Sequence, residues 1–398
     1  MTHEELDLFS ETRTERARPV RKPRKRRRRR IVLWVSMVVV LGLIAAGGYY
    51  GLRQILDIGS YDDYPGEGGT QVVIQVKNGE STGDIAATLA EADVVASSRA
   101  FVNAAESDER VRAIQPGYYV VKTKSSGAAA VSQIVAEEAK VGNLQIKAGT
   151  QLDDVKNGDK VTPGIVSLLA QASCADLNGE STCVEPEQLR ASVEKADLAK
   201  LGVPDWALPY ASKAEPTRRL EGLIMPGVYD VKPGSTPEEL WRQLVSNSAT
   251  QLQAVGMPNI AQDTGFTPYQ VTIMASLIER EAIEKDFPKV SRVTYNRLAE
   301  RMQLQYDSTI NYVLDRPTIR TNDADRNKAG PYNTYQNTGL PPTPISAPSP
   351  EAFKAAATPA KGTWLYFVRC QTDGTSCFAT NQAQHDQNVA DAQERGAY

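Results

Sequence analysis

Two glutamates, Glu279 and Glu281, are the residues whose type and spacing best suit acid–base chemistry. The segment before them carries an apolar stripe at helical spacing, made of Ile273, Met274, Leu277 and Ile278. Glu281 is the next position on that stripe. Glu279 lies off it, because the residues three and four positions earlier on its own face are Ser276 and Ala275. Because desolvation penalises the charged form, a carboxyl on an apolar face has a raised pKa, as a general acid requires.

A less specific interpretation of Glu281 stays open at this point. The carboxylate could end the stripe at the protein surface, or an internal arginine such as Arg297 could hold it in an ion pair.

The helix that carries Glu281 has a clear start. Residues 267–270 read Thr-Pro-Tyr-Gln, in which Thr caps the helix, Pro takes the first helical position and Gln reaches back to the cap.

Composition excludes several classes of protein. The 398 residues suffice for two or three domains. Four Cys and two His are too few for a zinc-ribbon array or an iron–sulfur protein, so we expect no metal and no cofactor. Residues 1–30 carry 12 Lys and Arg against 5 Asp and Glu, while the remaining residues carry 33 against 43. This acidic remainder argues against a nucleic acid as the partner.

A membrane anchor accounts for the charge asymmetry. Residues 31–52 are 22 residues without a formal charge, long enough to cross ~30 Å of hydrocarbon as one helix. Because the basic tail 1–30 resists translocation, we expect a single-pass protein of the cell membrane with a cytoplasmic N-terminus. A linker at 53–69 would lead to an extracytoplasmic body. A cleaved signal peptide and a nucleic-acid-binding arm are alternatives that explain a basic run beside a long apolar stretch less well.

The four cysteines fit an oxidising compartment. Cys174 and Cys183 are nine residues apart, and Cys370 and Cys377 are seven apart. Two close pairs of this kind predict two local disulfides, with four buried free thiols as the alternative. The second pair would staple a β-hairpin, because a strand-like run at 364–368 is followed by an Asp-Gly turn.

An internal near-repeat precedes the glutamate-bearing helix. The sequence IQVKNG at 74–79 recurs as LQIKAG at 144–149, and PGYYVVK at 116–122 recurs as PGVYDVK at 226–232. Each unit is predicted as strand, helix, strand, helix, and the second carries an insertion near 157–216 that includes the first cysteine pair. An exported strand–Gly–helix unit resembles a LysM-like wall-binding module, and a plain α+β spacer is the alternative.

Six short motifs follow one another along the second half of the chain: residues 275–281 (ASLIERE), 295–298 (YNRL), 304–309 (LQYDST), 332–335 (YNTY), 339–345 (GLPPTPI) and 355–361 (AAATPAK). In this order they resemble the YceG-like family, the endolytic murein transglycosylases. Residues 220–226 (LEGLIMP) also resemble the motif that opens the family's catalytic domain. The basic tail and the insertion lie outside the common pattern.

The resemblance implies cleavage of the β-1,4 bond between MurNAc and GlcNAc within peptidoglycan strands, which leaves 1,6-anhydro-MurNAc ends and sets strand length. The family's catalytic glutamate matches Glu281. Ala282 stands where the family often has Thr, and Ser308 stands where Pro is common. One carboxyl suffices for a lytic transglycosylase, because the 6-hydroxyl of the substrate takes the place of water. Peptidoglycan is then the substrate, and peptidoglycan synthases are candidate partners.

Other residues of these motifs are predicted to bind the substrate. They are Glu279, Asn296, Arg297, Gln305, Asp307, Tyr332, Asn333 and Tyr335. Tyr332, Asn333 and Tyr335 would form a sugar-stacking and hydrogen-bonding wall, or would merely be turn residues ahead of a Pro-rich loop. Asp307 would approach Glu281 in space, or would only cap its own loop.

The expected fold is α+β. It comprises a single transmembrane helix at 31–52, a LysM-like α/β module at 70–142 and an α+β transglycosylase domain at 143–398. Two other functions stay open. A muramidase would hydrolyse the same bond with Glu281 and Asp307, and a non-catalytic scaffold would only bind the wall.

Overall fold

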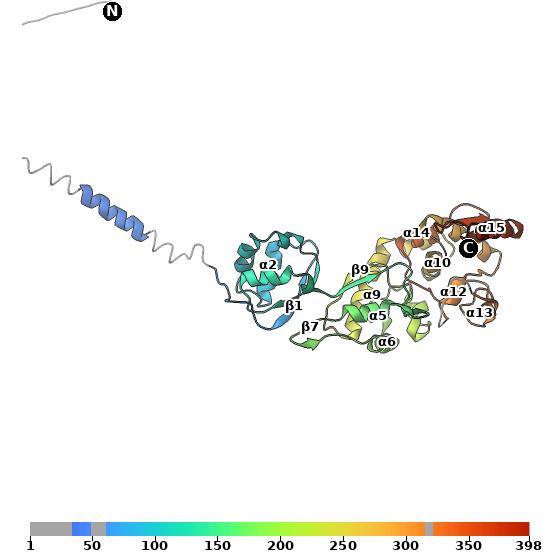
Figure 1. The fold of residues 1–398 in the computed structure, drawn as a ribbon, viewed down its shortest axis with the longest axis horizontal. Coiled ribbons are helices and arrows are strands. Elements are labelled where there is room, and N and C mark those ends of the chain that lie inside the picture. The colour runs from blue at the N-terminus through green and yellow to red at the C-terminus, as the bar shows by residue number, and fades with distance from the viewer. Residues whose placement is uncertain (1–33, 49–60, 315–320, 398) are drawn as a thin grey trace, which may run out of the picture. The chain divides into compact units, whose positions relative to one another are not determined.

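The computed structural model describes residues 34–48, 61–314 and 321–397. The chain divides into two compact units between Tyr61 and Asp62 (Figure 1). The second unit mixes helices with short antiparallel strands, which confirms the predicted α+β class.

The first unit contributes one described helix, residues 34–48, whose side chains are exposed. No helix within the three described ranges is both long and apolar enough to cross a membrane. The rest of the predicted span 31–52, the basic tail 1–30 and residues 53–60 of the predicted linker lie outside the described residues.

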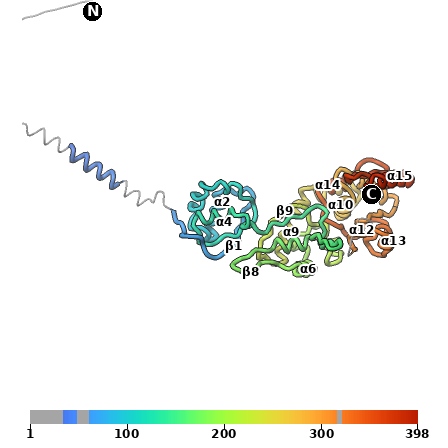
Figure 2. The backbone as a smooth tube through the Cα atoms, viewed as in Figure 1, coloured from blue at the N-terminus to red at the C-terminus, as the bar shows by residue number. Residues whose placement is uncertain are grey.

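The second unit begins with a small helix-covered sheet (Figure 2). Its elements are β1 (Gln71–Val76), α2 (Thr82–Glu91), α3 (Ser98–Ala105), η1 (Glu109–Ala113), β2 (Gly117–Lys122), α4 (Gly127–Ile134), η2 (Glu137–Ala139) and β3 (Lys140–Val141). The central strand β2 pairs antiparallel with both β1 and β3. The structure has two helices between β1 and β2 where one was predicted, because Asp93 turns the chain with φ 56° and Ser97 caps a new helix.

The second pair of repeated strand signals also forms a strand pair. β4 (Asn143–Ile146) runs antiparallel to β9 (Gly227–Asp230), and α9 (Pro237–Ala254) follows β9 as α4 follows β2. Between β4 and β9 lie β5 (Val155–Asn157), β6 (Lys160–Thr162), α5 (Ile165–Ala172), β7 (Asp176–Leu177), β8 (Glu180–Ser181), α6 (Pro186–Lys195), α7 (Leu198–Leu201), α8 (Leu208–Ala211) and η3 (Pro216–Arg218). The buried indole N–H of Trp241 donates to the Leu189 carbonyl at 3.0 Å, which joins α9 to α6.

Both predicted disulfides are present. Cys370–Cys377 staples the hairpin of β10 (Tyr366–Arg369) and β11 (Ser376–Ala379), as expected. Cys174–Cys183 brackets the short hairpin of β7 and β8. α15 (Gln382–Glu394) then packs on β10 and β11 and ends the described chain.

The helix that carries both glutamates is α10 (Pro268–Glu281). It starts as predicted, because the Thr267 hydroxyl accepts from the Gln270 amide and the Gln270 side chain accepts from the Thr267 amide. Its neighbours include α11 (Phe287–Ala299), α12 (Asp307–Asn311) and α14 (Pro350–Ala357) (Figure 1). The shorter elements η4 (Asn259–Ala261), η5 (Glu284–Asp286) and α13 (Asp323–Asn327) complete this part.

The apolar stripe of α10 is buried, but it is not the only buried face. Ile273 and Leu277 belong to the hydrophobic core shared with β4, α5 and α9, while Met274 and Ile278 belong to the core shared with α11 and α14. All residues from 271 to 278 are buried, because α10 lies between two cores. Burial along the helix therefore does not by itself separate Glu279 from Glu281.

Candidate active site

Glu281 is the last residue of α10, and its side chain is half-buried. The Ser308 amide donates to Glu281 Oε1 at 3.3 Å. Burial raises the pKa of Glu281 to about 7; the contact with Ser308 opposes that rise, and the nearby charge of Asp307 adds to it. A carboxyl with this pKa exchanges a proton readily at neutral pH.

Glu279 has different partners, although it lies only two residues away. Its Oε2 accepts hydrogen bonds from the Ser349 amide at 3.0 Å and from the Ser349 hydroxyl at 2.5 Å. Ser349 is the N-cap of α14. Glu279 therefore ties α10 to the start of α14.

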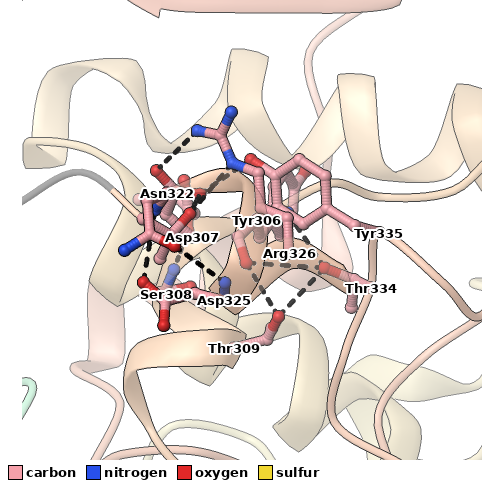
Figure 3. A network of polar contacts seen from close by, with 11 residues as sticks. Tyr306, Asp307, Ser308, Thr309, Asn322, Asp325, Arg326, Thr334 and Tyr335 are labelled. Carbon is pink, nitrogen blue, oxygen red and sulfur yellow. Dashed lines mark hydrogen bonds and ion pairs between the residues drawn. The ribbon is translucent and has the colours of Figure 1, made fainter. Parts of the chain in front are cut away.

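Asp307 opens α12 and lies in a polar network shown in Figure 3. Its Oδ1 accepts from the Tyr335 hydroxyl at 2.7 Å and from the Thr321 hydroxyl at 2.5 Å. Its Oδ2 lies 3.5 Å from Arg326 Nη2, and the Arg326 guanidinium lies 5.0 Å from the centre of the Tyr335 ring. Burial and the bond to Asp307 raise the pKa of Tyr335, so this hydroxyl remains a donor at neutral pH.

A buried hydroxyl cluster fixes the backbone beneath this network (Figure 3). The Thr334 hydroxyl accepts from the Tyr306 amide at 2.9 Å and lies 2.9 Å from the Thr309 hydroxyl. The Thr309 hydroxyl donates to the Tyr306 carbonyl at 2.7 Å. The loop at 332–335 is thereby locked to the start of α12, which keeps Asp307 and Tyr335 adjacent.

Arg297 and Asn296 support the backbone around the site. Arg297 donates to the carbonyls of Leu365 and Leu304, at 2.6 and 2.8 Å, and to Gln305 Oε1 at 3.2 Å. Asn296 donates to the Trp364 carbonyl at 2.9 Å. Within the described chain, no hydrogen bond or ion pair joins Arg297 to Glu281, so the interpretation that Arg297 holds Glu281 is wrong. Gln305 itself is exposed, with φ 56°.

Tyr332 and Asn333 are each 4% exposed and have protein partners. The Tyr332 hydroxyl lies 2.7 Å from the Thr343 hydroxyl. The Asn333 side chain donates to the carbonyls of Arg326 in α13 and of Lys328, and accepts from the Tyr335 amide at 2.9 Å. Of the three residues predicted as a wall, the structure places only Tyr335 beside Asp307. Their role in binding substrate stays a prediction.

Several residues of the site carried no recognised sequence signal. They are Thr321, Arg326 and Ser349, each of which bonds a carboxyl group named above. Ser308 was noted only as a departure from the family's pattern, and its amide bonds Glu281. A further buried acid, Glu221, lies in the motif at 220–226 and was not singled out. Among the residues that the structure describes, no group of three or more His, Cys, Asp or Glu could hold a metal ion.

Known proteins resemble this chain over most of its length. A curated protein of Streptococcus pneumoniae (strain D39) named "Endolytic murein transglycosylase" is 28% identical over 383 residues, covering 90% of this chain. A Bacillus subtilis (strain 168) protein of the same name is 27% identical over 331 residues, covering 80% of this chain and 83% of that protein. The chain spans 64% of the length of the pneumococcal relative.

The fold and the family agree with these relatives. The crystal structure of a YceG-like protein from Listeria monocytogenes aligns with TM-score 0.52 and 22% identity, covering 80% of this chain and 99% of that one, which shows a shared fold. The family profile matches residues 74–391, a range that includes every motif around Glu281 and Asp307. This chain belongs to the YceG-like family.

Proposed function

We propose that this chain is an endolytic lytic transglycosylase that cleaves the MurNAc–GlcNAc β-1,4 bond within peptidoglycan strands. The observation that carries the proposal is Glu281, a half-buried carboxyl whose pKa is raised to about 7 and which, among the described residues, accepts one hydrogen bond, from the Ser308 amide. Such a group can donate a proton and take one back near neutral pH. The shared name of the curated relatives supports the same reaction.

The proposed reaction uses Glu281 twice. As a neutral acid it protonates the glycosidic oxygen, and the bond between that oxygen and C1 of MurNAc breaks. The 6-hydroxyl of the same MurNAc forms a new bond to C1 and gives its proton to the Glu281 carboxylate. The products are a GlcNAc 4-hydroxyl and a 1,6-anhydro-MurNAc end, and the acid is regenerated without consumption of water.

The environment of Asp307 favours this reaction over hydrolysis. A muramidase needs a second carboxylate that is free to activate water or attack the sugar. Both oxygens of Asp307 are occupied, by Tyr335 and Thr321 on one and by Arg326 on the other. We infer that Asp307 holds the loop beside Glu281, and that the exposed parts of Tyr335 and Gln305 meet the sugars.

The experiment that tests the proposal compares Glu281→Gln with Glu279→Gln on purified peptidoglycan. Loss of one essential acid costs about 10²–10⁴-fold in rate, so Glu281→Gln should abolish release of anhydro ends while folding is retained. Glu279→Gln should weaken the cap on α14 and retain cleavage. Mass spectrometry identifies anhydro ends, which weigh one water less than reducing ends. Reducing ends as the main product would establish a muramidase, and unchanged cleavage by Glu281→Gln would overturn the assignment.

We further propose that residues 31–52 anchor the chain in the cell membrane with the N-terminus inside. The basic tail and the uncharged 22-residue stretch support this topology, as do two disulfides in the exported part. Protease added outside wall-stripped cells should degrade the chain beyond residue 61 and spare an epitope on residues 1–30. Survival of the whole chain would reverse the topology.

The proposal extends to residues 70–142 as a LysM-like module that holds a glycan strand. Its order of β1, two helices and β2, with a hydrophobic core of its own around Leu89 and Phe101, supports an autonomous binding unit. Because remote contacts help to position the scissile bond, such a module would favour long strands as substrates. Peptidoglycan synthases remain the candidate protein partners.

A further inference from the structure

A second buried acid, Glu221, plays no part in the mechanism above. It is 1% exposed, so no sugar reaches it. Its Oε2 accepts from the Leu152 amide at 3.2 Å and from the Tyr312 hydroxyl at 2.9 Å, while its Oε1 has no hydrogen-bond partner in the described chain. Burial raises the pKa of Glu221 to about 7 against the effect of these two donors. An apolar side chain in this place would avoid the cost of burying a carboxyl.

One series of hydrogen bonds leads from Glu221 to Glu281 through α12. The Tyr312 hydroxyl donates to Glu221, and the Tyr312 amide donates to the Ser308 carbonyl at 3.0 Å. The Ser308 amide in turn donates to Glu281. Glu221 therefore restrains the end of the same short helix whose first turn supplies the bonded partner of Glu281.

A second connection runs through residues 149–152. The Leu152 amide donates to Glu221, and the carbonyl of Gly149 accepts from Arg280 Nη1 at 3.2 Å. Arg280 directly precedes Glu281, and its positive charge lowers the pKa of both acids. Glu221 is thus connected to the end of α10 by two separate segments of backbone.

We propose that Glu221 is a positioning residue, which holds Tyr312 and with it α12 so that the Ser308 amide stays on the Glu281 carboxyl. The role rests on the proposed function, because its effect on rate is measured as glycan cleavage. Contiguous hydrogen bonds between packed segments are a physical route for such coupling. Glu221 acts through Tyr312 and does not touch the substrate.

The test uses Glu221→Leu, Tyr312→Phe and their double variant in the full-length chain, with Glu221→Gln as the conservative variant. Gln keeps an acceptor for Tyr312, whereas Leu and Phe each break the bond. Tyr229→Phe is the control, because it removes the hydroxyl of a buried tyrosine outside α12, which bonds the Met225 carbonyl. Melting temperature, kcat, KM and amide exchange of the 307–312 segment are measured for each variant.

We expect Glu221→Leu and Tyr312→Phe each to lower kcat about tenfold, the cost of one part-buried hydrogen bond to a carboxyl. KM should stay unchanged, amide exchange at 307–312 should rise, and the double variant should lose no more than either single change. Glu221→Gln should retain kcat. If Glu221→Leu does not fold, Tyr312→Phe gives the same comparison.

Two results would overturn the positioning role. One is a lower melting temperature with unchanged kcat per folded molecule and unchanged exchange in Tyr312→Phe. The other is an equal loss of kcat in Tyr229→Phe. If the unmodified chain releases no anhydro ends, the proposed function fails, while the exchange data still decide whether Glu221 restrains α12.

Discussion

The Ser308 amide that donates to Glu281 gives a prediction that distinguishes the effect of a backbone donor from that of a side chain. Ser308 is the second residue of α12, where an amide has no intrahelical partner and proline fits the helix. Ser308→Pro therefore removes the donor to Glu281, whereas Ser308→Ala keeps it. Ser308→Ala removes only the side-chain hydroxyl, which also lowers the pKa of Glu281, although it makes no hydrogen bond of normal geometry in the described chain. Ser308→Pro removes this hydroxyl as well as the amide donor.

The size of the effect follows from the geometry of this contact. A hydrogen bond to a charged group is worth about 1.5–3 kcal/mol, but the N···O distance of 3.3 Å exceeds the usual separation. We therefore take about half of this energy for the longer contact, which corresponds to a shift of about half to one unit in the pKa of Glu281. Because the amide favours the ionised carboxylate, its loss should raise the pKa of Glu281 above its value of about 7.

The assay is the pH profile of kcat for release of anhydro ends. Glu281 must be protonated to donate, so activity falls as the pH rises through its pKa. In Ser308→Pro the alkaline fall should move up by about half to one pH unit, and in Ser308→Ala it should move less. Proline also restricts the φ and ψ angles of the preceding residue, Asp307. The variants are therefore compared by the pH at which activity falls, and not by their maximal activity. An unmoved fall in Ser308→Pro, or an equal move in both variants, refutes the reasoning.

Three further predictions concern stability. Glu221 and Glu281 have pKa values raised from 4.5 to about 7, so their neutral forms stabilise the fold fully below pH 4.5, and this stability is lost as the pH rises through 7. The free energy of unfolding in urea should therefore be larger at pH 5 than at pH 8, and Glu221→Gln should reduce the difference between the two by up to about 3 kcal/mol. Arg297→Lys should lower stability by about 1–3 kcal/mol in the same assay, because lysine cannot reach several carbonyls at once. Loss of the Cys370–Cys377 bridge in a double alanine variant should lower it by about 2 kcal/mol.

The sequence predicted the features that depend on short-range patterns. The Thr267 cap, the hairpin stapled by Cys370 and Cys377 and the strands β1 and β4 each have their signal within ten residues. The repeat also predicted correctly that β1 and β2 of the first repeat have equivalents, β4 and β9, in the second. In both cases the local preferences of the chain agree with the final packing, which is why they could be recognised in advance.

The contacts of the site depend on long-range packing, which one sequence does not reveal. Tyr332 and Tyr335 are the same residue type three positions apart, yet one hydroxyl lies against Thr343 and the other donates to Asp307. Thr321 and Arg326 reach Asp307 from a different segment. The donor to Glu281 is a backbone amide, and every residue except proline has one, so residue type gave no signal.

The choice between Glu279 and Glu281 shows where a helical pattern stops being informative. The apolar stripe selected Glu281 because Glu281 follows Leu277 and Ile278 on one helix face. However, α10 is buried on all sides from 271 to 278, so Glu279 and Glu281 both lie at the end of a buried helix and burial does not distinguish them. Glu279 and Glu281 differ in the number of hydrogen bonds that each carboxyl accepts. Glu279 accepts hydrogen bonds from both the amide and the hydroxyl of Ser349, which hold its carboxyl group against the start of α14. Among the described residues Glu281 accepts one hydrogen bond, from the Ser308 amide at 3.3 Å, and burial raises its pKa to about 7, so it can give and take the proton that the proposed reaction requires.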